Sequence, residues 1–273
     1  MNPVATSAAA TNSALLPPGL ILPPTARQPA HVLLEGPQSR TREFLLLLHA
    51  VRDFIRGFRA LHFVGPSVTV FGSARFGEDD PYYGLARSVG QRLSTMGFTV
   101  ITGGGPGLME AANRGAKDVG GTSIGCNIQL PKEQQPNRYL DRWVTCEHFF
   151  VRKVLLFKYS YAFIALPGGF GTLDELFEAL TLIQNRKIAR FPVILIGTAF
   201  WKPLRRSLDA MVAAGTIARS DLRLVLITDD LDEAMQHLER DAIERFRLRE
   251  PRRPRALRWL GERSTPTPTP NAR

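Results

Sequence analysis

Residues 163–178 read Phe-Ile-Ala-Leu-Pro-Gly-Gly-Phe-Gly-Thr-Leu-Asp-Glu-Leu-Phe-Glu, and the segment changes character twice. An apolar run typical of a buried strand stops at Pro167, three glycines follow, and apolar residues then return at helical spacing. Glycines at 168, 169 and 171 remove the Cβ atoms that would keep a ligand away from the backbone. Because a helix N-terminus also carries partial positive charge, the segment predicts a strand, a phosphate-binding turn and a helix.

A purely structural alternative exists for the same residues. Thr172 followed three residues later by Glu175 has the spacing of a capping box, which satisfies the first free N–H groups of any helix. The capping box does not explain three glycines, since one glycine would make the turn. Both interpretations stay open at this level.

The same strand, loop and helix pattern extends in both directions from this segment. We expect strands at 67–71, 98–102, 122–128, 143–147, 191–196 and 222–227, and helices at 81–96, 149–160, 201–214 and 231–247. Apolar strands alternating with helices predict an α/β fold with a parallel sheet covered on both faces. In such folds ligands bind beyond the carboxyl ends of the strands, where the strand order reverses.

Two other glycine-containing loops follow expected strands. Gly72 to Gly77 imitates a P-loop, but Glu78 and Asp79 stand where Lys and Ser or Thr are required. The loop that begins at Gly103 has Leu108 in place of the third glycine of a dinucleotide fingerprint. The sequence therefore predicts neither a Walker motif nor an NAD site.

Some polar residues near these loops are candidate ligand contacts. Ser73 and Arg75 leave the carboxyl end of the first strand, although an ordinary polar turn is the favoured alternative for Ser73. Arg152 and Lys153 lie near the start of an expected helix, where the helix dipole disfavours cations. We expect an anion nearby, the alternative being an exposed basic pair.

Composition limits the classes of protein. With 273 residues and 44% hydrophobic content, the chain can bury one large core. We therefore expect one domain at 39–250 between an N-terminal arm (1–38) and a C-terminal tail (251–273), both of them disordered.

The net charge of the chain is +10, and six arginines against Glu262 place +5 of it in the tail. We therefore expect any nucleic acid to bind only to the tail. Cys126 and Cys146 have neither metal-site nor disulfide-scaffold spacing, and no apolar run is long enough to span a bilayer. We expect a cytoplasmic protein.

An amphipathic helix is expected ahead of the first strand, over residues 41–61. Its apolar positions are 44, 47, 48, 51, 54, 55 and 58, and Leu45 and Leu46 widen the stripe. The stripe is wider than one core contact needs. We therefore expect part of it to cover another layer of the fold or a second subunit.

Taken together, these motifs resemble those of one family. Pro167-Gly-Gly-Phe-Gly-Thr172 with Glu175, the pair Arg152-Lys153, and Gly103-Gly-Gly-Pro-Gly-Leu-Met-Glu110 are similar to the LONELY GUY (LOG) family of cytokinin riboside 5'-monophosphate phosphoribohydrolases. The form at 105–110 resembles the longer bacterial branch. The resemblance covers about residues 40–248 and implies a Rossmann-like, doubly wound parallel sheet in three α/β/α layers. The family was often labelled "lysine decarboxylase", but no convincing Schiff-base lysine motif is present.

The resemblance also implies roles for individual residues. Arg152 and Glu175 are expected to be catalytic, and Gly168, Gly169, Gly171 and Thr172 to hold a phosphate. Further substrate contacts are expected at Ser73, Arg75, Gly104, Gly105, Met109, Glu133, Lys153, Asp174 and Thr181. The implied reaction is hydrolysis of the N-glycosidic bond of a purine nucleoside 5'-monophosphate, with adenine or an N6-substituted adenine as base, in a homodimer or larger homo-oligomer.

Elementary chemistry agrees with this reaction. Breaking an N-glycosidic bond builds positive charge on the ribose, so a carboxylate beside the sugar stabilises the transition state more than the ground state. Glu175 is the best-placed carboxylate, while Arg152 stays protonated and can only orient Glu175 or hold the phosphate. The reaction requires neither metal nor cofactor. The alternative is a non-catalytic protein that binds a nucleotide or single-stranded nucleic acid.

Overall fold

The computed structural model describes residues 36–130 and 135–244. The chain divides into two units, Met1–Arg40 and Thr41–Arg273. Only residues 36–40 of the first unit are described, and the architecture below is that of the second. The arm expected at 1–38 lies almost wholly outside the described residues and the tail at 251–273 entirely outside them, so both remain predictions.

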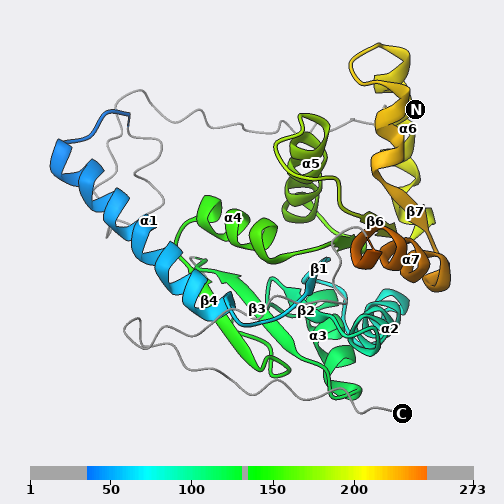
Figure 1. Ribbon diagram of the computed structural model, residues 1–273, viewed down its shortest axis with the longest axis horizontal. Coiled ribbons are helices and arrows are strands. Elements are labelled where there is room, and N and C mark those ends of the chain that lie inside the picture. Colours follow the sequence, from blue (N-terminus) through cyan, green and yellow to red (C-terminus); the bar gives the residue numbers. More distant parts are fainter. Residues whose placement is uncertain (1–35, 131–134, 245–273) are drawn as a thin grey trace, which may run out of the picture. The chain divides into compact units, whose positions relative to one another are not determined.

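Seven strands form one sheet in which every neighbouring pair is parallel (Figure 1). They are β1 (Ser67–Phe71), β2 (Thr99–Thr102), β3 (Ser123–Ile128), β4 (Arg142–Cys146), β5 (Phe163–Ala165), β6 (Val193–Ile196) and β7 (Leu226–Thr228). Their order is β4-β3-β2-β1-β5-β6-β7, so the chain builds outward from β1 to one edge, returns beside β1, and builds outward to the other edge. The doubly wound parallel sheet expected from the sequence is confirmed.

Helices cover both faces of this sheet. They are α1 (Arg40–Leu61), α2 (Pro81–Thr95), α3 (Leu108–Asp118), α4 (Phe149–Tyr159), α5 (Phe170–Gln184), α6 (Thr198–Ala213) and α7 (Leu231–Leu238). Buried side chains of α1, α4, α5 and α6 join one apolar cluster, and those of α2, α3 and α7 join the other. Right-handed crossovers explain why α2 and α3 lie on one face and α4, α5 and α6 on the other, because reversing the direction of travel across the sheet moves the connecting helix to the opposite face.

The expected strands up to residue 196 match within two residues, but the C-terminal elements differ. The strand expected at 222–227 is a 3₁₀ helix at Arg219–Leu224 followed by the short edge strand β7. Asp221 favours this turn because its Oδ2 atom accepts hydrogen bonds from Ala218 N and Gln184 Nε2. The helix expected at 231–247 ends at Leu238 and continues as a π-helical segment to Glu244, and 245–247 lie outside the described residues.

The apolar stripe of α1 does not face the sheet. The buried residues of α1 are Ala50, Asp53, Gly57 and Leu61. Phe44, Leu47 and Ile55 are more than half exposed, although Phe54 packs partly against the core. A close approach to α4 explains the choice, since a Cβ on Gly57 would lie 2.2 Å from Leu155 Cδ1. Small residues therefore make the intramolecular contact, and the large ones remain available for another.

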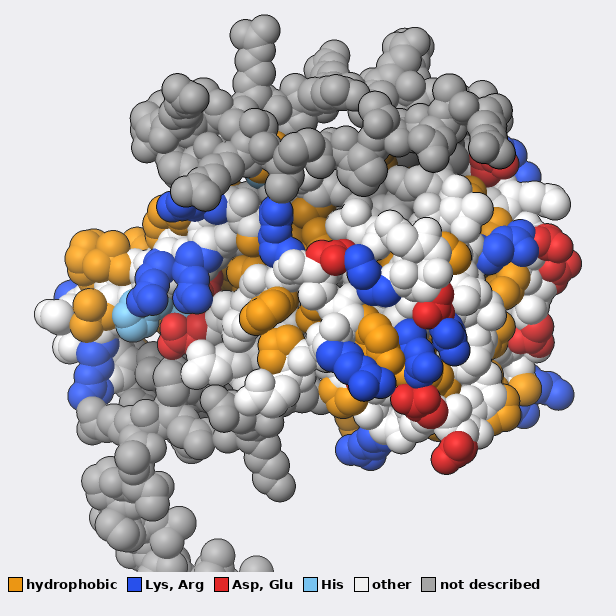
Figure 2. All heavy atoms as spheres, turned by 90° about the horizontal axis from the view of Figure 1, so that it is seen from below, with side chains coloured by type: hydrophobic (Ala, Val, Ile, Leu, Met, Phe, Trp, Pro, Cys, Tyr) orange, Lys and Arg blue, Asp and Glu red, His pale blue; other side chains and the backbone are white. Residues whose placement is uncertain are grey.

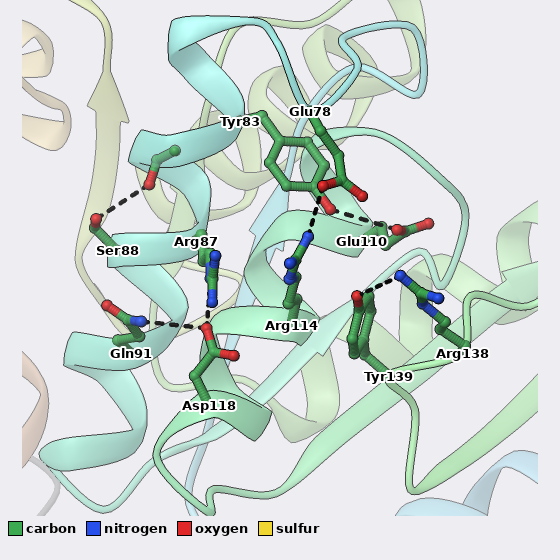
Figure 3. Close-up of polar contacts among 11 residues, drawn as sticks. Glu78, Tyr83, Arg87, Ser88, Gln91, Glu110, Arg114, Asp118, Arg138 and Tyr139 are labelled. Atoms are coloured by element: carbon green, nitrogen blue, oxygen red, sulfur yellow. Dashed lines mark hydrogen bonds and ion pairs between the residues drawn. The ribbon is translucent and has the colours of Figure 1, made fainter.

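Helices α2 and α3 pack with their backbones in near contact, and polar side chains flank the contact (Figure 3). A Cβ on Gly90 would lie 2.0 Å from the carbonyl oxygen of Ala112, and one on Gly115 would lie 1.9 Å from that of Arg87. Beside them Arg87 pairs with Asp118 and Arg114 with Glu78. The helix pair therefore forms a closely packed unit behind β1 and β2.

The surface shows mixed character. On the face drawn in Figure 2, Lys and Arg side chains lie among Asp and Glu side chains, with apolar side chains between them.

Among the residues described, no helix is both long enough and apolar enough to span a bilayer.

The α2–α3 contact generates a prediction with an internal control. Gly90→Ala places a methyl group against backbone that cannot move cheaply, so we expect it to destabilise the protein by about 1–3 kcal/mol. Gly84 lies on the same helix with no atom within 4 Å of its Cβ position, so Gly84→Ala should instead stabilise the protein by roughly 0.5–1 kcal/mol. Urea unfolding of both variants measures the difference, and equal effects would contradict the packing described.

Candidate active site

Three loops meet at the carboxyl edge of the sheet, where the strand order reverses between β1 and β5. Ser73 N donates to the carbonyl of Pro167 at 3.0 Å, and Leu108 N donates to the carbonyl of Ser73 at 2.9 Å. Leu166 N donates to the carbonyl of Phe71 at 2.9 Å. These bonds tie together the loops after β1, β2 and β5, which is the position where open parallel sheets bind their ligands.

The glycine turn after β5 presents free backbone donors. Within the described chain, four successive N–H groups meet no protein acceptor: those of Gly168, Gly169, Phe170 and Gly171. Gly169 and Gly171 have no atom within 4 Å of their Cβ positions, so the space in front of the turn is open. A Cβ on Gly168 would lie 2.2 Å from Thr172 Oγ1, which explains glycine at that position. The turn has the donors and the room that a phosphate needs.

The capping-box interpretation is wrong. Helix α5 begins at Phe170 with Gly169 as N-cap, so Thr172 is the third helical residue and its N–H is bonded to the carbonyl of Gly169. Glu175 is then the sixth residue, in the second turn rather than the first. Its side chain does not return to the helix start: the residue is 2% exposed and its Oε2 atom has no hydrogen-bond partner.

Burial dominates the electrostatics of Glu175. It raises the pKa of this carboxyl from 4.5 to about 7, and the nearby charges of Asp174 and Glu178 act in the same direction. The positive charges of Arg152 and Lys153 oppose the shift without cancelling it. A buried acceptor without a partner is uncommon in folded proteins and calls for a specific explanation, such as a ligand.

Arg152 reaches the same region from α4, where it is the fourth helical residue. Its Nε atom donates to the carbonyl of Cys126 at 3.0 Å. Its guanidinium lies against the second glycine loop, because a Cβ on Gly103 would be 3.0 Å from Nη2 and 2.7 Å from Met109 Sδ. The structure therefore places Arg152 against Gly103 and Met109 of the second loop, and near enough to Glu175 for its charge to lower the pKa of that carboxyl.

A buried polar network that the sequence did not reveal holds this second loop. Asn113 Oδ1 accepts hydrogen bonds from Thr102 Oγ1 at 2.6 Å and Asn137 Nδ2 at 3.0 Å. Thr102 Oγ1 in turn accepts from Gly104 N, and Asn137 Nδ2 also donates to the carbonyl of Gly105. Asparagine in the middle of an amphipathic helix was the available signal, because this residue disfavours helix interiors unless its side chain is bonded.

The loop also covers an amide with an unused acceptor. Asn127 Oδ1 is buried without a hydrogen-bond partner, and it lies 1.9 Å from the position that a Cβ on Gly104 would occupy. Gly104 has a φ of 72°, a conformation that favours glycine. Both the backbone conformation and the lack of space therefore require glycine at 104.

Three other predicted contacts lie together in a groove between α4 and α5. Lys153 forms ion pairs with Asp174 at 2.8 Å and Glu178 at 2.6 Å. These three residues and Thr181 line an open groove of about 630 Å³ between α4 and α5, together with Phe170, Leu173 and Phe177. The anion expected beside Lys153 is thus supplied by the protein itself. Binding roles for Lys153, Asp174 and Thr181 remain predictions.

Two predicted contacts follow β1, and one lies outside the described residues. Ser73 is half-buried, and its Oγ atom accepts a hydrogen bond from Arg75 N at 3.1 Å. The Arg75 side chain is exposed beside the loops. Glu133 lies outside the described residues, so its role remains a prediction from the sequence.

Comparisons with known proteins identify the family. A sequence-family model described as "Possible lysine decarboxylase" matches residues 109–238. A cytokinin riboside 5'-monophosphate phosphoribohydrolase of Mycobacterium marinum is 31% identical over 157 residues, which cover 56% of this chain and 82% of the relative. The chain belongs to this LOG family. A rice LOG phosphoribohydrolase is 33% identical over 176 residues, covering 62% of this chain and 70% of the relative.

Solved structures of other proteins are similar to this chain as well. A molybdenum cofactor binding protein from Rippkaea orientalis superimposes with a TM-score of 0.49 at 25% identity, covering 64% of this chain and 96% of that one. The family-model match includes Arg152, Glu175 and the glycine turn before α5. Helix α1 and strand β1 lie outside it.

The burial of Glu175 generates a prediction about stability and pH. Because the folded protein holds the carboxyl proton more tightly than the unfolded chain, wild-type stability should fall as pH rises from 4.5 through 7. Each pH unit between the two pKa values is worth about 1.36 kcal/mol, so the loss should reach about 3 kcal/mol at pH 8. Glu175→Gln cannot ionise. Its stability relative to wild type should increase by that amount between pH 4.5 and pH 8 in urea titrations, and a pH-independent difference would refute the shift.

Proposed function

We propose that this chain hydrolyses the N-glycosidic bond of a purine nucleoside 5'-monophosphate, releasing the free base and ribose 5-phosphate. The base is adenine or an N6-substituted adenine. The relatives' names specify a riboside 5'-monophosphate as substrate. The observation that carries the proposal is the position of Glu175, a buried carboxyl with an unpartnered oxygen one helical turn beyond four free backbone donors.

Each part of a nucleotide has a matching group at this edge of the sheet. The 5'-phosphate sits on the glycine turn, where the free N–H groups and the N-terminus of α5 favour an anion. The ribose then lies over Glu175, whose carboxylate stabilises the cation that develops as the glycosidic bond breaks. Arg152 holds the phosphate or orients Glu175 through charge-assisted hydrogen bonds of about 1.5–3 kcal/mol.

The raised pKa of Glu175 suits this chemistry. A carboxyl with a pKa of about 7 is present in both protonation states near neutral pH, which is where a general acid or base is most effective. Glu175 can therefore activate the attacking water in addition to stabilising the ribosyl cation. A phosphate-binding turn alone would need no such group, so the buried carboxyl favours an enzyme over a protein that only binds nucleotides.

The apolar surface supports a homodimer or a larger homo-oligomer as part of the same proposal. Phe149, Phe150 and Val154 on α4 and Phe170 on α5 are between 46% and 93% exposed. The large apolar residues of α1 are exposed as well. Exposed apolar side chains of this size are typical of a protein interface, and a two-fold axis would pair such a surface with its own copy. The cytoplasmic location and the nucleic-acid contact of the basic tail, both expected from the sequence, remain part of this proposal.

The first functional prediction concerns substrate and catalyst together. We expect release of adenine from AMP and a much lower rate from adenosine, because adenosine leaves the donors of the glycine turn unused. Glu175→Gln should keep AMP binding and lower kcat by about 10²-fold or more, the scale of a positioned acid or base. Free-base assays with a panel of nucleoside monophosphates measure both effects.

A structural control accompanies this experiment. The melting temperature of Glu175→Gln at pH 7 should equal or exceed that of wild type, since the substitution removes a buried ionisable group. Equal turnover of AMP and adenosine would refute the role of the phosphate turn. Near-normal kcat in a folded Glu175→Gln protein would refute the catalytic role of Glu175, and a wild-type protein that binds AMP without releasing adenine would be a nucleotide-binding protein.

The oligomer prediction uses two valines of equal chemistry. Val154 on α4 is 46% exposed, and Val119, after α3 on the opposite face of the sheet, is 48% exposed. Val154→Glu buries a charge in the proposed interface and should shift light scattering at micromolar concentration toward the monomer. Val119→Glu should leave the oligomer intact. A monomeric wild-type protein, or equal behaviour of the two variants, would contradict the proposed interface.

A further inference from the structure

A buried carboxylate on α1 contacts the beginning of α4. Asp53 is 4% exposed, and its Oδ2 atom accepts hydrogen bonds from Glu147 N at 2.7 Å and His148 N at 3.3 Å. The same oxygen lies 3.1 Å from His148 Nδ1. One side chain therefore contacts two consecutive backbone donors and a ring nitrogen at the N-cap position of α4.

Helix α4 has no cap of its own. His148 is its N-cap residue and makes no side-chain capping bond, and the first turn of α4 contains no acidic residue. Arg152 and Lys153 instead place two positive charges near the end of the helix that disfavours them. The Asp53 carboxylate acts from outside the helix: it accepts hydrogen bonds from the N-cap N–H and from the N–H of the residue before it, and it places a negative charge at the positive end of the helix dipole.

The path from Asp53 to Arg152 is short. The N–H of His148 donates to Asp53, and the carbonyl of the same residue accepts a hydrogen bond from Arg152 N at 3.2 Å. The Arg152 side chain then reaches Cys126 and the Gly103 loop. A displacement of the first turn of α4 would thus move the guanidinium away from the carboxyl edge of the sheet.

A carboxylate is not needed merely to attach α1. Burying a charge is unfavourable unless its hydrogen bonds are satisfied, and Ala50, Gly57 and Leu61 already pack α1 against the body. The acceptor is specific for the two donors at the start of α4. Helix α1 also lies outside residues 109–238, so this support comes from a part of the chain that the family model does not include.

We propose that Asp53 is a positioning residue that fixes the first turn of α4, and with it the Arg152 guanidinium, for the bound nucleotide. This inference rests on the proposed function. Asp53 does not touch the nucleotide: it acts through His148 and the backbone of α4.

The test uses Asp53→Ala with a matched control in the full-length protein. Leu61→Ala removes a fully buried side chain from the same helix without affecting the donors at the start of α4. We expect Asp53→Ala to lower kcat/KM for AMP by about 10-fold to 100-fold, the scale of a misplaced catalytic group. Leu61→Ala, compared at a temperature where both variants are folded, should change kcat/KM less than about threefold, within the context dependence expected of a change away from the site.

A rescue variant separates capping from simple tethering. His148→Asp supplies a carboxylate at the N-cap position of α4 itself, which is in the extended conformation that an N-cap requires. Adding it to Asp53→Ala should restore at least about half of the lost kcat/KM on a logarithmic scale, although α1 remains without its contact. Failure of this rescue, or equal losses in Asp53→Ala and Leu61→Ala, would overturn the inference.

Two further measurements keep the outcome unambiguous. Amide hydrogen exchange over residues 149–155 should accelerate in Asp53→Ala and not in Leu61→Ala, whatever the substrate is. In an Arg152→Ala background the effect of Asp53→Ala on AMP affinity should disappear, and a persistent effect would refute the path through Arg152.

If Asp53→Ala does not fold, Asp53→Asn replaces it. We then expect a several-fold loss of kcat/KM, because one acceptor oxygen remains. A wild-type protein without AMP hydrolysis would refute the proposed function, while the exchange result would still decide whether Asp53 holds α4.

Discussion

The site depends on the hydrogen bonds that join β1 to β5. These two strands are neighbours in the sheet although more than ninety residues separate them, as the pairing of Thr69 with Phe163 shows. Their carboxyl ends are locked by the bonds between Leu166 and Phe71 and between Pro167 and Ser73. The connections from β1 to β4 run toward one edge of the sheet, the β4–β5 connection returns across it, and the connections from β5 to β7 run toward the other edge. The crevice above the junction is therefore a consequence of chain direction.

Burial of Glu175 illustrates a conflict between stability and chemistry. A carboxyl with an unpartnered oxygen in the core destabilises the protein at neutral pH, and a glutamine there would avoid the cost of ionisation. The same desolvation brings its pKa to about 7 and prevents water from screening its charge. A group that is unfavourable for folding is thus well suited to stabilising a cation that exists only in the transition state.

Helix α1 uses its two faces differently. The face with Ala50, Asp53, Gly57 and Leu61 packs against the body, while Phe44, Leu47 and Ile55 remain exposed. Residue size explains the assignment, since the close contact between Gly57 and Leu155 leaves no space for larger side chains. The helix can therefore support α4 from one side and present an apolar surface on the other.

The sequence by itself determined the architecture and the chemical character of the site. Local patterns suffice for both, because apolar strands, helical spacing and glycine turns are properties of consecutive residues. Glu175 and Arg152 were predicted as partners, yet their surroundings were not predictable. The N-cap is Gly169 rather than Thr172, so Glu175 lies in the second turn of α5, where it is buried and its Oε2 atom has no hydrogen-bond partner.

Only the tertiary structure decided which distant groups meet. The contact of Asp53 with the start of α4 joins residues ninety-five positions apart, and Asn113 meets Asn137 across a loop. The local sequence specifies neither partner: Asn113 in a helix interior signals a bonded side chain without saying what it bonds to, and a single Asp in an amphipathic helix is compatible with an exposed position. The apolar stripe of α1 was visible in the sequence, but its orientation depended on how closely α4 could approach. Packing between elements sets such outcomes, and packing is not a property of consecutive residues.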